Sequence, residues 1–331
     1  MLEQQRLLEI IDRFRSTSVA LIGDLVLDRF ILGTPKRISR EAPVIILRHE
    51  GRRDIPGGAA NALANMAALG LRVAALGAIG DDEPGEALRT ALADRGVDTG
   101  SLAVVPGYRT PTKVRILGGG ASSLKHQVAR YDIEDELPDG GWYTGLVERL
   151  AGVCDCTAVA ISDYGYGCVQ PDVVDALRDV VGPDGWITLD SRYRIGDFVG
   201  VDGATPNLEE LEVAVGRRLG GDDEIAEAAT ELRSDLGARF LLATRGNRGM
   251  TLVDGRGDAT HIPVFGGDEV ADVTGAGDTV LAVLTAALAA GASPVEGARL
   301  ADIAAGLVVM KLGTATITAD ELRAAITGDH A

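Results

Sequence analysis

The stretch DVTGAGDTVLAVLTAAL, residues 272–288, joins a loop of small residues to an apolar segment with helical spacing. Gly275, Ala276 and Gly277 carry almost no side chain, and Asp278 follows them directly. The free N–H groups and the positive dipole end of a helix start bind anions, and small residues let a ligand approach them closely. We therefore expect an anion-binding helix start here, with a carboxylate in its first turn.

Phosphoryl transfer is a chemistry that needs this combination. The glycine loop would stabilise charge on the transferring phosphoryl group, and Asp278 would accept the proton of the attacking alcohol. On spacing alone, the alternative that Asp278 is only a favourable charge at a helix start is equally open. The sequence lacks the glycine- and lysine-containing loop motif of P-loop enzymes, which excludes that class.

Short apolar runs alternate with helical patterns along the rest of the chain. Near-continuous apolar runs suit parallel strands that are covered on both faces, and several of the intervening helical segments end in Gly, the usual helix stop. The alternation predicts a doubly wound α/β fold, with a mostly parallel sheet flanked by helices. The expected strands lie in residues 17–28, 72–80, 157–165, 186–192 and 239–246.

Residues 29–56 and 103–131 break this rhythm, because they are rich in β-branched and basic residues and have no helical period. The first segment predicts two strands with a connection, and the second predicts a hairpin. We expect them to pair into a small β-sheet lid inserted in a single domain over residues 1–331. The alternative is that they are edge strands that extend the main sheet.

Charge and composition limit the classes of partner that this chain is expected to bind. It has 331 residues and a net charge of -17, which disfavours binding to nucleic acid or to an anionic membrane surface. No apolar stretch is long enough to cross a membrane, and the charged, amphipathic N-terminus is unlike a signal peptide. Three cysteines without metal-ligand spacing favour reduced thiols, so we expect a cytoplasmic protein.

A second group of polar residues lies early in the chain. Asp24 and Asp28 stand at and just beyond the end of the first expected strand, and the stretch PGGAAN places Gly57, Gly58 and Asn61 at a helix start. Asp and Asn side chains in such positions can bind sugar hydroxyls. Each of these residues also has an alternative, purely structural role. Asn61 could be a polar residue at a helix entry, and the two glycines could form a tight turn.

Three motifs in this order resemble the ribokinase-like carbohydrate kinases of the PfkB family. They are PGGAANALANMAALG (56–70), TPNLEELE (205–212) and DVTGAGDT (272–279), and the resemblance extends over nearly the whole chain. It implies a ribokinase-like fold with a lid, Asp278 as catalytic base and Gly275, Ala276 and Gly277 as the anion hole. It also implies that Asp28, Gly57, Gly58 and Asn61 hold the sugar.

The same resemblance implies that ATP is the phosphoryl donor and that Mg²⁺ is required. Asn207 and Glu210 would organise Mg²⁺ and the ATP phosphates, Glu210 through a metal-bound water. Thr244 and Gly246 would belong to the ATP site. Activation by K⁺ and a homodimer formed through the lid are left open.

Within the family, five further stretches resemble the branch that phosphorylates O1 of D-glycero-β-D-manno-heptose 7-phosphate for ADP-heptose synthesis. The chain departs from that branch at Arg40, at Asp302 and in the stretch DSRYR (190–194), so the acceptor could instead be another sugar, sugar phosphate or nucleoside. A different alternative is that the protein is a non-catalytic sugar or nucleotide sensor. The five stretches are RISREAPV (37–44), PTKVRIL (111–117), ISDYGYG (161–167), ATPNLEELEVAVG (204–216) and KLGTATIT (311–318).

A phosphorylated sugar needs cations in the pocket or lid. Lys113 and Arg115 are two residues apart in an expected lid strand, so their side chains point the same way, and Arg192 is a further candidate. For any one of them, a solvated lid residue is the alternative. Tyr164 and Tyr166 could line the pocket or pack against it. Other candidate cations are Arg37, Arg52, Arg53 and Arg130.

Overall fold

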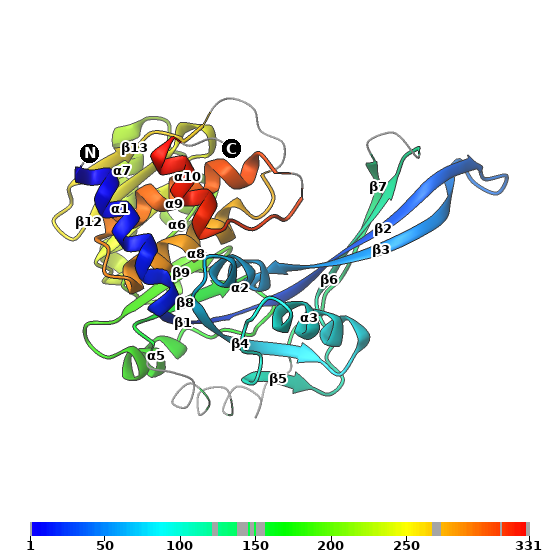
Figure 1. The fold of residues 1–331 in the computed structure, drawn as a ribbon, viewed down its shortest axis with the longest axis horizontal. Helices are drawn as coiled ribbons and strands as arrows, with labels where there is room; N and C mark the ends of the chain where they lie inside the picture. Colours follow the sequence, from blue (N-terminus) through cyan, green and yellow to red (C-terminus); the bar gives the residue numbers. More distant parts are fainter. Residues whose placement is uncertain are drawn as a thin grey trace.

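A nine-stranded sheet forms the centre of the body, seen here in a computed structural model (Figure 1). The structure describes residues 2–120, 125–137, 145, 149, 156–266, 273–311 and 313–328. Seven neighbouring strands of the sheet run parallel, and the last two at one edge are antiparallel. In spatial order the strands are β13 (Ala259–Ile262), β12 (Met250–Asp254), β11 (Phe240–Thr244), β10 (Gly203–Ala204), β9 (Trp186–Ser191), β8 (Ala158–Asp163), β1 (Ser18–Gly23), β4 (Arg72–Gly80) and β5 (Leu102–Val105).

The expected doubly wound α/β fold is confirmed, because the chain winds outward from β1 to both sides of the sheet. The five expected strands correspond to β1, β4, β8, β9 and β11, with one correction: residues 17–28 do not form one strand. The main-sheet strand ends at Gly23; the backbone N–H of Asp24 still donates to Ser162 O, and from Leu25 the chain continues as a strand of the lid.

Helices cover both faces of this sheet, and alternate residues of each strand face opposite sides. Val19 and Leu21 of β1 belong to the core beneath α1, α2, α3, α8, α9 and α10, whereas Ala20 and Ile22 belong to the core beneath α5, α6 and α7. The helices are α1 (Leu2–Arg13), α2 (Ala59–Ala68), α3 (Glu83–Ala93), α5 (Val173–Val181), α6 (Leu208–Val215), α7 (Asp222–Leu236), α8 (Ala276–Ala289), α9 (Pro294–Val309) and α10 (Ala319–Thr327).

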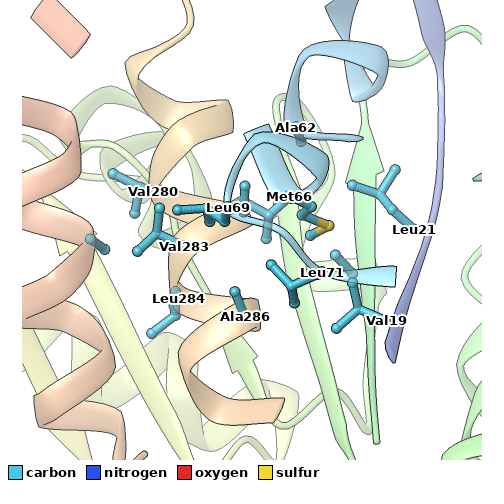
Figure 2. Packing of buried hydrophobic residues seen from close by; sticks show 14 of the residues in the cluster. Val19, Leu21, Ala62, Met66, Leu69, Leu71, Val280, Val283, Leu284 and Ala286 are labelled. Atoms are coloured by element: carbon cyan, nitrogen blue, oxygen red, sulfur yellow. The ribbon is translucent and has the colours of Figure 1, made fainter. Parts of the chain in front are cut away.

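Helix α8 lies at the heart of the first core, as Figure 2 shows. Its residues Val280, Val283 and Leu284 are buried and pack near Met66 of α2. Within α8, the run from Asp278 to Leu288 is buried on all sides. A helix that is apolar all round is stable only inside a core, so packing fixes the position of its first turn, which carries Asp278.

The lid is a four-stranded sheet that projects from one side of the body (Figure 1). Its strands in spatial order are β3 (Ile45–Gly58), β2 (Leu25–Ile38), β6 (Thr112–Gly118) and β7 (His126–Ile133). The long β2–β3 pair is antiparallel, β2 and β6 are parallel, and β6 and β7 are antiparallel. The start of the second lid segment at residue 103 is wrong, because residues 102–105 form β5, which pairs with β4 in the main sheet.

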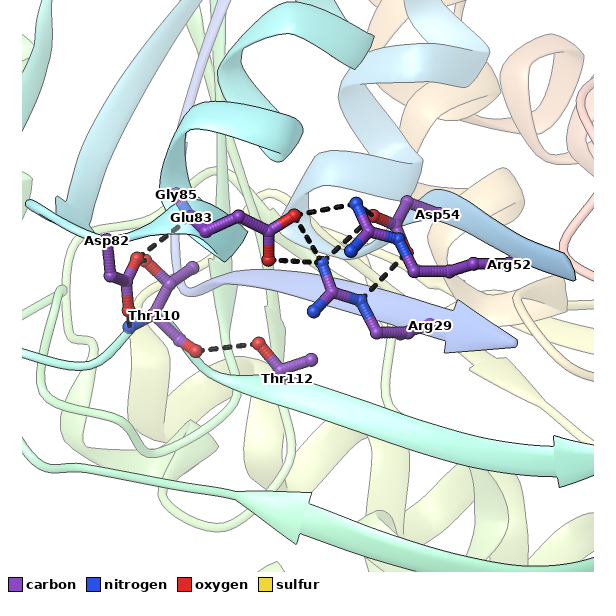
Figure 3. Close-up of polar contacts among 8 residues, drawn as sticks. All are labelled: Arg29, Arg52, Asp54, Asp82, Glu83, Gly85, Thr110 and Thr112. Carbon is purple, nitrogen blue, oxygen red and sulfur yellow. Dashed lines mark hydrogen bonds and ion pairs between the residues drawn. The ribbon is translucent and has the colours of Figure 1, made fainter. Parts of the chain in front are cut away.

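The root of the lid is bound to the start of α3 by charged side chains (Figure 3). Arg29 of β2 forms a bidentate pair with Asp54 of β3, at 2.9 Å for both contacts, and also reaches Glu83 of α3 at 2.8 Å. Arg52 contacts the same Glu83 carboxylate at 2.6 Å. A bidentate guanidinium–carboxylate pair has a defined geometry, so this network sets the angle at which the lid leaves the body.

Two further expectations from the sequence concern where in the cell the protein lies. Within the described part of the chain, no helix combines the length and the apolar character needed to span a bilayer. The expectation of reduced thiols is wrong at Cys156, which is disulfide-bonded, whereas Cys168 is a free and buried thiol. Burial among apolar residues raises the pKa of Cys168 well above its usual value.

Truncation in α8 should reveal how strongly this helix is held. Leu284→Ala removes a fully buried side chain, and we expect a loss of about 2–5 kcal/mol in the free energy of unfolding. Leu2→Ala is the matched control, because Leu2 is 88% exposed, and a change within about 0.5 kcal/mol is expected. Chemical denaturation measures both. Equal stabilities of the two variants would contradict the packing described here.

Candidate active site

A cavity of about 530 Å³ lies where the carboxyl ends of the parallel strands meet the lid. This is the edge at which open α/β sheets bind ligands. The body contributes residues at or just after the ends of β8, β9, β10 and β11 together with the start of α8, and the lid contributes residues of β2, β3, β6 and β7. Of the residues expected from the sequence, Asp28, Gly58, Lys113, Arg115, Arg192, Asn207, Glu210, Thr244, Gly275, Gly277 and Asp278 line this cavity.

Asp278 is a buried carboxylate with a hydrogen-bond donor on each oxygen. Asn61 of α2 donates through Nδ2 to Oδ2 at 2.8 Å, and Tyr164 donates through its hydroxyl to Oδ1 at 2.7 Å. Burial raises the pKa of Asp278 to about 6, although both hydrogen bonds and the nearby Lys113 act to lower it. The carboxylate therefore titrates close to neutral pH, as a general base should.

The loop before Asp278 requires glycine at position 275. Gly275 has φ +83°, in the left-handed region that favours glycine, and a Cβ there would lie 2.5 Å from Asn61 Nδ2. The absence of a side chain thus lets Asn61 reach Asp278. Asn61 was expected to hold sugar hydroxyls, which stays a prediction; its amide donates to the candidate base, and Asn61 is not among the residues that line the cavity.

Asp28 and Arg115 form an ion pair across the lid sheet, between β2 and β6. A Cβ at position 57 would lie 2.6 Å from Asp28 Oδ2, so any larger residue there would displace the Asp28 carboxylate. Gly58 has φ +55° and serves as the residue from which α2 begins. The two glycines therefore keep the Asp28 carboxylate close to the start of α2, beside Asp278.

The cavity lining carries cationic side chains beside the acidic ones of Asp28, Asp163, Asp190, Glu210 and Asp278. Lys113 lies 5.5 Å from the centre of the Tyr164 ring, and burial lowers its pKa. Arg115 stacks on Phe30, and Arg130 pairs with Asp132 at 2.6 Å. With Arg192, these are four cationic side chains around one cavity. Arg37, Arg52 and Arg53 do not line it, and Arg52 belongs to the network at the lid root.

Asn207 and Glu210 form a capping box at the start of α6. The Glu210 N–H donates to Asn207 Oδ1, and the Asn207 N–H donates to Glu210 Oε2, both at 2.9 Å. Burial raises the pKa of Glu210. Capping alone accounts for this pair, but both residues also line the cavity, so they are available to a ligand.

Asp190 is a site residue that the sequence reasoning missed. It is the penultimate residue of β9 and lines the cavity, and its pKa is raised well above the usual value by burial and then by the negative charges of Glu210 and Asp278. Its signal in the sequence was an acid at the end of an apolar strand. Within the described ranges no group of three or more His, Cys, Asp or Glu residues could hold a metal alone.

A second cavity of about 430 Å³ adjoins the first and shares Thr244 and Gly277 with it. Ala276 and Gly246 line it, as does Asp302, whose pKa burial raises to about 6. Its remaining wall is largely apolar and suits a flat ring held beside the anion-binding loop. The apolar members, which the sequence reasoning did not identify, are Met250, Val264, Phe265, Val273, Val280, Ala305, Val309 and Met310.

Sequence comparison finds a family and close relatives. The model of the pfkB family carbohydrate kinases matches residues 16–129 and 188–321. The Bifunctional protein HldE of Mesorhizobium japonicum is 40% identical over 327 residues, and that of Nitrosococcus oceani is 43% identical over 317 residues. These alignments cover 97% and 95% of this chain but only 64% of each relative.

Structure comparison finds the same fold in proteins of low sequence identity. Phosphofructokinase-2 from Escherichia coli in complex with substrates and products has a TM-score of 0.75 at 20% identity, covering 94% of this chain and 99% of that one. Arabidopsis thaliana ribokinase complexed with ribose and ATP has a TM-score of 0.71 at 19% identity, with 94% and 98% covered.

The burial of Asp278 predicts a pH-dependent cost to stability. Its folded pKa of about 6 lies above the ordinary 3.8, so the folded state binds the proton more tightly, and stability falls as pH rises from about 4 to about 6. Asp278→Asn removes this loss. At pH 8 the variant should be more stable than the unaltered protein by about 1–3 kcal/mol, with the gain vanishing below pH 4. Denaturation at several pH values measures this, and a variant less stable at pH 8 would contradict it.

Proposed function

The chain belongs to the pfkB family of carbohydrate kinases, and from that premise we propose that it transfers the γ-phosphoryl group of ATP to O1 of D-glycero-β-D-manno-heptose 7-phosphate. The observation that carries the proposal is the position of Asp278, between the anion-binding start of α8 and a cavity with four cationic side chains. The acceptor lies in this cavity beneath the lid, and the nucleotide base lies in the adjoining apolar cavity.

Asp278 acts as the general base in this mechanism. It accepts the proton of the acceptor hydroxyl as that oxygen forms a bond to the γ-phosphorus. The bond between the γ-phosphorus and the β,γ-bridging oxygen breaks, and ADP leaves with the electron pair. The N–H groups at Gly275, Ala276 and Gly277 stabilise charge on the transferring group, since a helix start favours anions.

The residues around the phosphates fit Mg²⁺. This ion prefers oxygen ligands, keeps several waters and is held in kinases by one or two carboxylates together with substrate phosphates. Glu210, with Asn207 beside it, would hold it through water, and Asp190 offers a second carboxylate in the same cavity. Bound there, Mg²⁺ neutralises negative charge on the phosphates. Activation by K⁺, which the sequence left open, is not part of this proposal.

The choice of a phosphorylated acceptor rests on two supports. Lys113, Arg115, Arg130 and Arg192 line a cavity that also carries five acidic side chains, and a phosphate on the acceptor would pair with these cations, in competition with the aspartates that hold Arg115 and Arg130. The five stretches that resemble one branch of the family favour the heptose phosphate in particular. The alternative acceptor is another sugar, sugar phosphate or nucleoside. The alternative function is that of a non-catalytic sensor.

We also propose that two chains pair through the lid. The exposed apolar residues of the lid include Ile38, Val44, Ile45, Val128 and Tyr131, and such residues on a projecting sheet favour a protein contact. A cytoplasmic location remains the expectation from the sequence. Light scattering on the purified chain, compared with a variant carrying Ile38→Lys and Tyr131→Lys, tests the pairing, and a monomer in both cases would contradict it.

Replacement of the base tests the kinase mechanism. Asp278→Asn should lower turnover by about 10²–10⁴-fold, the usual contribution of a positioned base, while the affinity for Mg²⁺·ATP changes little. ADP release with a range of sugars and sugar phosphates measures turnover, and the same screen identifies the acceptor. Near-normal turnover of the variant would remove Asp278 from the mechanism, and no ADP release with any acceptor would favour the sensor.

Removal of Arg115 tests the phosphorylated acceptor. A charge-assisted contact contributes about 1.5–3 kcal/mol, so Arg115→Ala should raise the KM for the sugar phosphate roughly ten- to a hundredfold, with the KM for ATP little changed. Arg115→Lys should rescue only partly, because Lys lacks the bidentate geometry. Arg37→Ala is the control, since Arg37 is an exposed lid arginine outside the cavity.

The ion pair of Arg115 with Asp28 gives Arg115 an alternative role, which is to hold the lid in shape. If Arg115 only shapes the lid through Asp28, then Arg115→Ala should impair a phosphorylated and an unphosphorylated acceptor equally. Equal impairment would reject a contact between Arg115 and a phosphate of the acceptor. If the unphosphorylated sugar were the better substrate of the unaltered enzyme, the sugar phosphate would be rejected as acceptor.

A further inference from the structure

Tyr164 contacts the candidate base directly, yet neither the family motifs nor the mechanism above gives it a role. It follows the last residue of β8, and its hydroxyl donates to Asp278 Oδ1 at 2.7 Å. Burial and then the negative charge of Asp278 raise the pKa of Tyr164 well above its usual value. The phenol therefore keeps its proton throughout the working pH range and acts only as a donor toward Asp278.

The main chain around Tyr164 is anchored by another buried carboxylate. Asp24 Oδ2 accepts the N–H of Tyr164 at 2.8 Å and that of Tyr166 at 3.1 Å, and Oδ1 accepts the N–H of Cys168 at 2.9 Å. Asp24 is only 2% exposed and lies between β1 and β2. The ring of Tyr164 is covered on one face by Lys113 of the lid. Both its backbone and its ring are thus held in place.

We infer that Tyr164 is a positioning residue for phosphoryl transfer: its hydroxyl orients the Asp278 carboxylate and keeps it ionised at neutral pH. This inference rests on the proposed function, because it assigns Tyr164 a part in the work of the base. Asn61, which lies in α2, fixes one oxygen of the Asp278 carboxylate, and Tyr164, which follows β8, fixes the other. Two donors from different elements set the plane of the carboxylate and direct its remaining lone pairs.

A carboxylate removed from water favours its neutral form, and a neutral Asp278 could not accept a proton. Hydrogen bonds donated to the ionised form oppose this effect. Charged groups facing the pair act in both directions: Asp28 of β2 and Asp190 of β9 disfavour ionisation, whereas Lys113 of β6 favours it, and Arg192 after β9 lies near Tyr164.

Tyr164 takes no part in the proton balance of the reaction. The proton of the acceptor hydroxyl passes to a lone pair of Asp278 that is not occupied by Tyr164 or Asn61. The phenol remains neutral before and after this step, because its own pKa is too high for it to give up its proton. Its contribution is therefore a shift in the pH at which the base becomes competent, together with the orientation of the base.

Tyr164→Phe tests this inference, because it removes the hydroxyl and keeps the ring that Lys113 covers. The experiment measures turnover and kcat/KM from pH 5 to pH 9, with Mg²⁺·ATP and the acceptor found by the screen. A charge-assisted hydrogen bond corresponds to about one to two pH units. The acid limb of the pH–rate profile, where activity falls on the acidic side, should therefore move to higher pH by that amount. Turnover at pH 7 should fall about two- to tenfold and recover on the alkaline side.

Tyr166→Phe is the matched control. Tyr166 also loses a phenol hydrogen bond to a carboxylate in this variant, the one to Glu134 at 2.6 Å, but this contact lies away from Asp278. Its acid limb should coincide with that of the unaltered enzyme. Substrate phosphates titrate alike in all variants, so a difference between limbs reports the protein. An unmoved limb in Tyr164→Phe, or an equal loss of turnover at every pH, would overturn the inference.

A measurement without catalysis separates this inference from the proposed function. If Tyr164 keeps Asp278 ionised, the fall in stability with rising pH should extend in Tyr164→Phe from about pH 6 to about pH 7–8, and it should disappear when Asp278→Asn is added. Loss of activity in Asp278→Asn with an unchanged stability profile in Tyr164→Phe would reject only the role of Tyr164. An enzyme without kinase activity would reject the proposed function and leave the stability test standing.

Discussion

The whole site depends on one buried carboxylate that is held from both sides. Asp278 lies in the first turn of α8, where core packing leaves the helix no freedom to shift. Asn61 and Tyr164 reach it from α2 and from the end of β8, and Gly275 leaves the space that the Asn61 amide occupies. Three distant parts of the sequence therefore converge on one group, and the fold is what brings them together.

Burial makes this carboxylate a base near neutral pH and also makes it costly. The surrounding charges limit that cost: Lys113 lies nearby on the lid, while Asp28 is paired with Arg115 and thus partly neutralised. The lid accordingly has two tasks, to cover the cavity and to bring positive charge to an acidic body. Its root is fixed on α3 by Arg29 and Glu83, so both tasks depend on a rigid attachment.

The sequence predicts what is local and misses what is made by packing. Apolar runs bounded by Gly or Asp predicted the main strands, and the glycine loop predicted an acid in the first turn of a buried helix, because these signals are contained in short windows. The contact between Asn61 and Asp278 spans 217 residues, and no local pattern encodes it. The position of Asp190, the pairing of Arg115 with Asp28 and the placement of residues 102–105 in the main sheet have the same origin, since each depends on which strands become neighbours.

The central claim is that Asp278 titrates near neutral pH and that its ionised form is the active one. The most direct measurement is a carbon-13 NMR titration of the aspartate carboxyl groups, with Asp278→Asn used to assign the resonance. The account predicts a midpoint near pH 6 that coincides with the acid limb of kcat/KM in the same enzyme. A midpoint below pH 4, or an acid limb that does not follow the Asp278 resonance, would contradict it.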